Sequence, residues 1–219
     1  MKTFKKAFCI LCIGLFFVGI ASAKRSKKKI EKTIQVETID WQGKALGAQI
    51  PEWAILTAEN NTTKLAALPE FKGKNIFCTT VSGVDQNFLK TQITQFDAVP
   101  AFSRLLSQSV LAKFGGALEG SDGDTEIFLK EIVATLSRTS FSGLDTSKIF
   151  WSKTRTIDKV NDTISDTYHY YLACTIDKEN LKEQVGNALK KLETNSSEQE
   201  RLRADVVSAM DELMLLNQN

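Results

Sequence analysis

The side chains best suited to chemistry are few in this chain of 219 residues. The one histidine, His169, lies in the run Tyr168-His169-Tyr170-Tyr171, and no second histidine exists to help it hold a metal ion. In a strand, His169 would face away from Tyr168 and Tyr170. Its chemistry suits a general base or a ligand, but we interpret it as a strand residue that faces solvent or an interface.

Other catalytic and ligand-binding motifs are incomplete. The segment 121–126 (SDGDTE) resembles a calcium loop, yet with Asp122 as position 1 the place of the final glutamate falls on Val133. We therefore interpret this segment as a turn that caps a helix. The sequence contains no phosphate-binding glycine loop and no nucleophile elbow, and His169 is the one histidine available for Cys–His catalysis with Cys78 or Cys174. No catalytic residue, cofactor-binding residue or metal ligand is predicted, and the chain is predicted not to be an enzyme.

Aromatic and basic side chains suggest few binding surfaces. Trp41, Trp53 and Trp151 could form a carbohydrate platform, but we interpret them as packing anchors. Basic residues are interleaved with aromatic ones only at 150–153 (FWSK), and 28 basic residues nearly balance 26 acidic ones. Nucleic-acid binding is therefore not predicted.

Cys78 and Cys174 are the only cysteines after residue 23. Both lie in β-like runs, 76–81 and 170–176. If these strands are neighbours outside the cytoplasm, the two thiols could form a disulfide. Buried free thiols are the alternative, and the geometry of the strands decides between them.

The N-terminus has the pattern of a secretory signal peptide over residues 1–23. Lysines precede an apolar run at 7–20, which is too short to span a membrane comfortably, and Ala21 and Ala23 supply the small residues that a signal peptidase requires. We predict cleavage after Ala23 and export to the periplasm or the outer membrane; an uncleaved anchor is the alternative. No lipobox is present.

Five basic residues would open the mature chain. They could contact an anionic membrane or a wall polymer, while a solvated tail is the alternative. These residues are Lys24, Arg25, Lys27, Lys28 and Lys29.

The predicted elements follow from apolar spacing and from breaks in it. After an extended basic lead-in over 24–50, a short helix begins at Pro51 and fades at 60–63. Pro100 implies a kink, or two abutting helices with Asp97 near the join, and Asp177 is placed to cap a later helix. Strands are predicted at 74–82, 147–155 and 166–176, and the other helices at 85–114, 125–136, 177–192 and 198–216.

This order of elements predicts an α+β fold. A small antiparallel sheet packs on a long helix, with additional C-terminal helices. The α+β domain covers 51–192 and a C-terminal amphipathic helix lies within 193–219; the apolar stripe of that helix must bury against the domain or a partner. The edges of such a sheet invite pairing with other subunits.

Several motifs occur in an order that resembles a known family. Pro51-Glu52-Trp53 comes first, AFSRLL at 101–106 lies in the long helix, and FSG at 141–143 precedes the strand with Trp151; YYLA at 170–173 is followed by Ile176-Asp177-Lys178. Over about residues 51–190 this resembles the LPP twenty-kilodalton lipoprotein family of bacterial envelope proteins. The resemblance implies a helix cradled by an antiparallel sheet and a non-enzymatic role, often in self-assembling structures near the outer membrane.

We therefore expect an exported, non-enzymatic structural or scaffold protein of the bacterial cell envelope. It would self-associate or bind another envelope protein, and the resemblance includes flagellum-associated components. The alternative is a monomeric periplasmic binding protein for a lipid, sugar or peptide, because a long helix beside a small sheet can leave an apolar groove.

Overall fold

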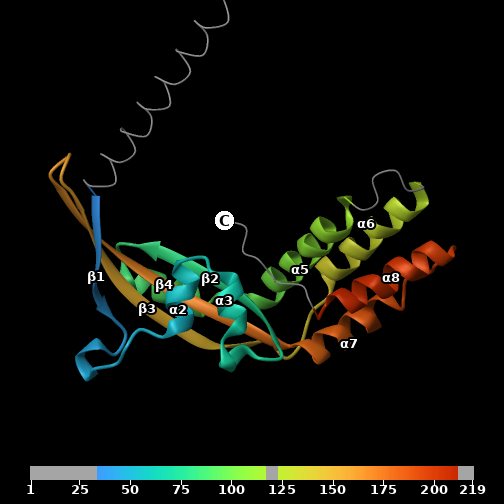
Figure 1. The fold of residues 1–219 in the computed structure, drawn as a ribbon, viewed down its shortest axis with the longest axis horizontal. Helices are drawn as coiled ribbons and strands as arrows, with labels where there is room; N and C mark the ends of the chain where they lie inside the picture. The colour runs from blue at the N-terminus through green and yellow to red at the C-terminus, as the bar shows by residue number, and fades with distance from the viewer. Residues whose placement is uncertain (1–33, 117–122, 212–219) are drawn as a thin grey trace, which may run out of the picture. The chain divides into compact units, whose positions relative to one another are not determined.

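The computed structural model describes residues 34–116 and 123–211, and its fold is α+β, as predicted (Figure 1). The predicted signal peptide with Ala21 and Ala23 and the basic cluster at 24–29 lie outside the described residues. The strands are β1 (Ile34–Trp41), β2 (Lys74–Gly83), β3 (Asp145–Asp158) and β4 (Thr163–Asp177). The α-helices are α2 (Glu52–Ala58), α3 (Thr62–Ala67), α4 (Gln86–Thr94), α5 (Ala98–Phe114), α6 (Gly123–Arg138), α7 (Lys178–Leu189) and α8 (Ser197–Ala209).

The four strands form one sheet in the order β1-β3-β4-β2. β2 and β4 are antiparallel, with Lys74 opposite Asp177 and Gly83 opposite Tyr168. The described chain divides into two compact units. The smaller contains residues 34–40 and 153–167, and the larger contains the rest.

In the larger unit, both faces of the sheet are covered by helices. Successive residues of β4 point to opposite faces, so Tyr170 and Leu172 join one core and Tyr171 and Ala173 join the other. The first core contains residues of α4 to α8, and the second contains residues of α2 and α3. Figure 1 shows α5, α6, α7 and α8 gathered in one bundle.

The helices form where apolar residues recur at three- and four-residue steps. Along α5, Phe102, Leu106 and Val110 are fully buried, and Phe102 contacts Phe141 edge-on at 5.5 Å between ring centroids. Pro100 does not kink one long helix; α4 ends at Thr94 and a separate helix begins after Asp97, so the second alternative is confirmed. Pro100 is tolerated because it lies in the first turn of α5, where backbone N–H groups have no partner within the helix.

Two elements are missing from the sequence prediction, and the helix expected at 198–216 ends earlier, at Ala209. Part of the expected lead-in at 24–50 is the strand β1, whose end is tied to β3 by the Gln42 N–H to Trp151 carbonyl bond of 3.0 Å. The polar break at 60–63 begins a second helix, α3, because the Asn61 side chain caps it by accepting from the Lys64 N–H. Both predictions failed because hydrogen bonds, not apolar periodicity, define these elements.

The C-terminal helix α8 is part of the core of the larger unit. Leu202 and Val206 are buried among the helices, so the described part of its apolar stripe packs against its own domain. Its end is held by Asn75 and Lys178, which donate to the carbonyls of Met210 (3.3 Å) and Asp211 (2.7 Å). Such donors satisfy carbonyl groups that have no partner within the helix.

A further prediction concerns the start of α7. Asp177 occupies the predicted cap position of α7, but its side chain makes no capping hydrogen bond there. In the part of the chain that the structure describes, no helix is both long enough and apolar enough to cross a membrane.

Leu202→Ala should lower the free energy of unfolding by about 2–5 kcal/mol, because it opens a cavity in the core. Arg201→Ala, at the exposed neighbouring position, should change it by less than about 0.5 kcal/mol. Urea denaturation of both variants measures the difference. If Leu202→Ala reduced the solution mass without changing the unfolding midpoint, α8 would be a surface for a partner.

Candidate functional site

A cleft of about 430 Å³ lies within the larger unit, where α4 borders the sheet. Its volume falls in the range of small-molecule binding sites. The sheet contributes Ile149, Trp151 and Tyr170, and the other side chains are polar. These polar residues are Gln42, which follows β1, and Gln86, Asn87, Lys90 and Thr94 of α4.

Helix α4 positions the polar wall of the cleft. Its first turn is fixed by Asp85, whose Oδ1 accepts hydrogen bonds from the N–H groups of Asn87 (2.9 Å) and Phe88 (3.0 Å). Leu89 and Ile93 then anchor one face of the helix in the core. The lining residues 86, 87, 90 and 94 recur at three- and four-residue steps on another face, so burial of the first face presents the second to the cleft.

The aromatic part of the cleft is held by the sheet. Trp151 is half-buried and contacts Tyr168 at 6.2 Å between ring centroids, while Tyr170 is almost fully buried. The backbone of Trp151 is fixed by the hydrogen bond from Gln42. Gly43 adopts φ 81°, a left-handed conformation that favours glycine, and turns the chain directly after Gln42.

The cleft lining combines several classes of polar group with aromatic rings. Its lining residues include amides, a hydroxyl, an ammonium group and aromatic rings, but no carboxylate, imidazole or thiol. The Thr94 hydroxyl lies 2.8 Å from the Lys90 carbonyl, to which it donates within the helix. Lys90 is the one charged side chain among the lining residues, so the cleft favours neutral or anionic ligands over cations.

His169 lies on the other face of the sheet from the cleft. The register pairs it with Ser82, and Ser82 Oγ lies 2.8 Å from His169 Nδ1. The imidazole is half-buried and stacks on Tyr171 at 6.4 Å between ring centroids. Partial burial lowers the pKa of His169, so the ring is neutral at pH 7. The prediction that His169 faces away from Tyr168 and Tyr170 is confirmed.

The two cysteines lie on neighbouring strands, but they point to opposite faces. Cys78 is opposite Ala173, and Cys174 is opposite Phe77. Directly opposed residues share a face and successive residues alternate, so Cys78 and Cys174 do not form a disulfide; of the two alternatives, free thiols are the one observed. Burial raises the pKa of the Cys174 thiol to about 12 and also raises the pKa of Cys78, whose sulfur lies 3.5 Å from the Thr57 hydroxyl.

The three tryptophans do not form a common platform. Trp53 of α2 is buried in the core that this helix forms with the sheet. Trp41 packs against the same core, and its Nε1 donates to the Ala48 carbonyl at 2.8 Å. These two are packing anchors, as predicted. Trp151 lies on the other face, where it contributes to the cleft.

The calcium-like segment at 121–126 is described only from Gly123 onward. There it forms the start of α6, with Asp124 and Glu126 in the first turn, where acidic side chains complement the helix dipole. Glu126 is paired with Lys130 at 2.6 Å. Among residues 34–116 and 123–211, no group of His, Cys, Asp and Glu side chains could hold a metal ion.

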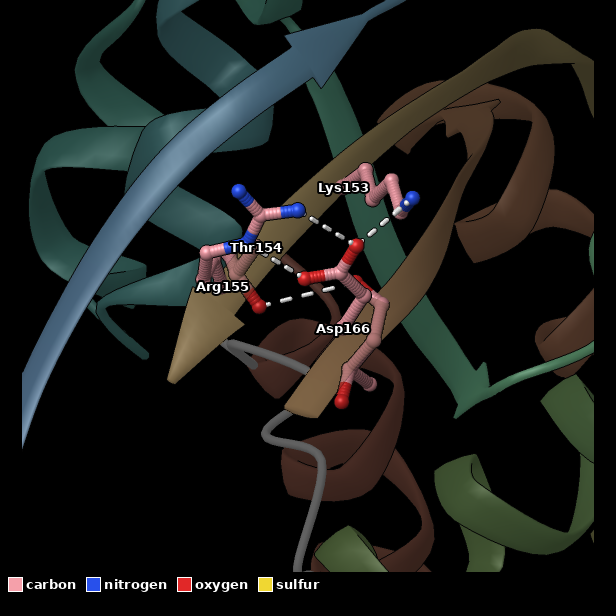
Figure 2. Close-up of polar contacts among 5 residues, drawn as sticks. Lys153, Thr154, Arg155 and Asp166 are labelled. Atoms are coloured by element: carbon pink, nitrogen blue, oxygen red, sulfur yellow. Dashed lines mark hydrogen bonds and ion pairs between the residues drawn. The ribbon is translucent and has the colours of Figure 1, made fainter. Parts of the chain in front are cut away.

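A cluster of charged side chains lies in the smaller unit, on the paired strands β3 and β4. Figure 2 shows Lys153 and Arg155 converging on Asp166. Asp166 accepts from Arg155 Nε at 2.8 Å and Nη2 at 3.0 Å and pairs with Lys153 Nζ at 2.9 Å. These cations hold the pKa of Asp166 far below its usual range. Because the bidentate contact fixes one β3 residue against one β4 residue, we interpret the cluster as structural.

The chain matches no protein-family model, no curated protein and no solved structure. The resemblance to the LPP twenty-kilodalton lipoprotein family therefore remains an expectation.

Protein comprising residues 24–219 should contain two free thiols per chain after denaturation without reductant. In the native state at pH 8, the reaction of Cys174 with a thiol reagent should be slow, because its thiolate is scarce and buried. Cys78, which is only partly buried, should react first. Ellman titration of the native protein measures how fast each thiol reacts, and titration in guanidinium counts the free thiols. Cys174→Ser is the control that leaves one thiol. Absence of free thiols in guanidinium would show a disulfide.

Proposed function

We propose that this chain is an exported, non-enzymatic binding protein of the bacterial cell envelope, and that it holds a small ligand in the cleft beside α4. The observation that carries the proposal is the composition of the cleft lining, which combines aromatic side chains from the sheet with amide side chains from α4 and Gln42. A site with a few polar groups around an apolar surface is typical of ligand pockets.

Export is proposed from the N-terminal pattern. Residues 1–23 combine lysines, an apolar run and the small residues Ala21 and Ala23. The ordered motifs that resemble the envelope lipoprotein family support the same location. The protein isolated from the periplasm should therefore begin at Lys24.

Binding in the cleft would need little rearrangement of the protein. Trp151 and Tyr170 are held by the sheet, and α4 is fixed by the Asp85 cap and by Leu89 in the core. Because these groups are already held in place, ligand binding would cost little conformational entropy of the protein. A flat apolar group would lie against Trp151, while polar groups at its rim would bond the amides.

Trp151→Ala should abolish ligand-induced thermal stabilisation of the protein. The test is a thermal-shift screen of residues 24–219 with panels of saccharides, short peptides and fatty acids. Phe88→Ala is the matched control, because Phe88 is an exposed aromatic residue of α4 that does not line the cleft. The control should keep the shift caused by any hit. A hit whose shift survives in Trp151→Ala binds elsewhere and would contradict the proposal.

A second function, self-assembly as an envelope scaffold, is favoured by the strand β1. This strand ends the strand order of the sheet, and its Ile34 and Val36 side chains are 46% and 63% exposed. Exposed apolar edge strands are sites of pairing between chains. The buried stripe of α8, in contrast, gives this function no support.

Light scattering separates the two functions. A binding protein comprising residues 24–219 should have the mass of a monomer. A scaffold should give a discrete oligomer that Val36→Lys dissociates, because a lysine on an edge strand opposes pairing. Val160→Lys, at an exposed turn position of the same unit, is the control and should leave the mass unchanged.

A further inference from the structure

We infer that the ligand of the cleft is an acidic saccharide, a pyranose that carries a carboxylate. Its ring face lies on Trp151, its hydroxyls bond the amides of α4 and Gln42, and its carboxylate pairs with Lys90. This inference rests on the proposed function, since it names the ligand class of the same cleft.

The aromatic side chains of the cleft explain why a sugar ring would bind there. One face of a pyranose presents C–H bonds, whose positive ends suit the negative face of an aromatic system. Trp151 has the largest aromatic ring among the lining residues, and the residue is half-buried, so part of it remains accessible. Tyr170, which also lines the cleft, is almost fully buried.

The amide side chains of the cleft explain why a ligand with several hydroxyl groups would bind there. Gln42, Gln86 and Asn87 each carry both a donor and an acceptor, which matches sugar hydroxyl groups that both donate and accept. A fatty acid would leave these amides without partners when it displaced their water, at a cost for each group. The polar wall therefore favours a saccharide over a lipid.

The ammonium group of Lys90 explains why the sugar would carry a carboxylate. It lies four residues after Gln86 on the same face of α4, so the ammonium group and the amides can contact one ligand. No acidic side chain is among the lining residues, and the nearby Asp85 uses its Oδ1 to cap the helix. A charge-assisted hydrogen bond is about twice as strong as a neutral one, so Lys90 favours an anionic sugar over its neutral counterpart.

The experiment follows the indole N–H resonance of Trp151 by NMR in ¹⁵N-labelled protein comprising residues 24–219. Trp151→Phe assigns that resonance. The probes are a hexuronate disaccharide and the uncharged hexose disaccharide of the same linkage. We expect the hexuronate to bind about tenfold more tightly, as expected for one charge-assisted hydrogen bond.

Lys90→Gln tests the role of the charge. It should reduce the affinity for the hexuronate about tenfold and leave the affinity for the neutral sugar within about twofold, because only the charged contact is lost. Lys64→Gln, at an exposed lysine of α3 outside the cleft, is the matched control and should change neither affinity. The amide spectrum of each variant shows whether it is folded.

The outcomes separate the inference from the proposed function. Equal affinities for the two sugars, unchanged in Lys90→Gln, would overturn the acidic-saccharide inference and leave the proposed function standing. The same would follow if a short peptide or a fatty acid moved the Trp151 resonance and neither sugar did. If no probe of any class moved that resonance, both would be overturned.

Discussion

The pairing of β4 with β2 is the constraint on which the larger unit depends. Residues 170–176 of β4 are all buried, because helices cover both faces of the strand. Tyr170, Leu172 and Cys174 belong to one core, and Tyr171 and Ala173 belong to the other. A slip of one residue would exchange these two sets of side chains and mismatch both cores at once. The helices on each side therefore specify a single register.

This register also decides which reactive groups can meet. Cys78 lies opposite Ala173, one residue away from Cys174. Because successive residues alternate, this offset of one residue places the two cysteine side chains on opposite faces of the sheet. The same alternation joins His169 to Ser82 and places Tyr170 in the cleft on the other face. A sequence shows that two strands can pair. It does not show whether a given pair of residues on them lies on the same face of the sheet or on opposite faces.

The elements that apolar spacing could reveal were predicted from the sequence. The strands β2, β3 and β4 and the helices α5, α6 and α7 bury regularly spaced apolar residues, and their predicted positions agree with the structure to within a few residues. β1 and α3 were missed because β1 is mostly exposed and α3 depends on the Asn61 cap. The polar wall of the cleft was missed for a related reason: residues 86, 87, 90 and 94 have the pattern of a solvated helix face. Only the adjacent aromatic side chains, supplied by strands more than 50 residues away, make that face part of a site.

The burial of α8 bears on the choice between a scaffold and a binding protein. An amphipathic helix near the end of a chain can serve as a surface for partners, and the sequence left that role open. In the structure, Val206 and Met210 are fully buried, and Asn75 of β2 holds the carbonyl at the end of the helix. Removing α8 would expose the core formed with α6 and α7, so this helix stabilises the domain, and the described part of its stripe is not available to a partner. Because that surface is used within the chain, the cleft beside α4 is the feature of the larger unit that best supports a specific interaction.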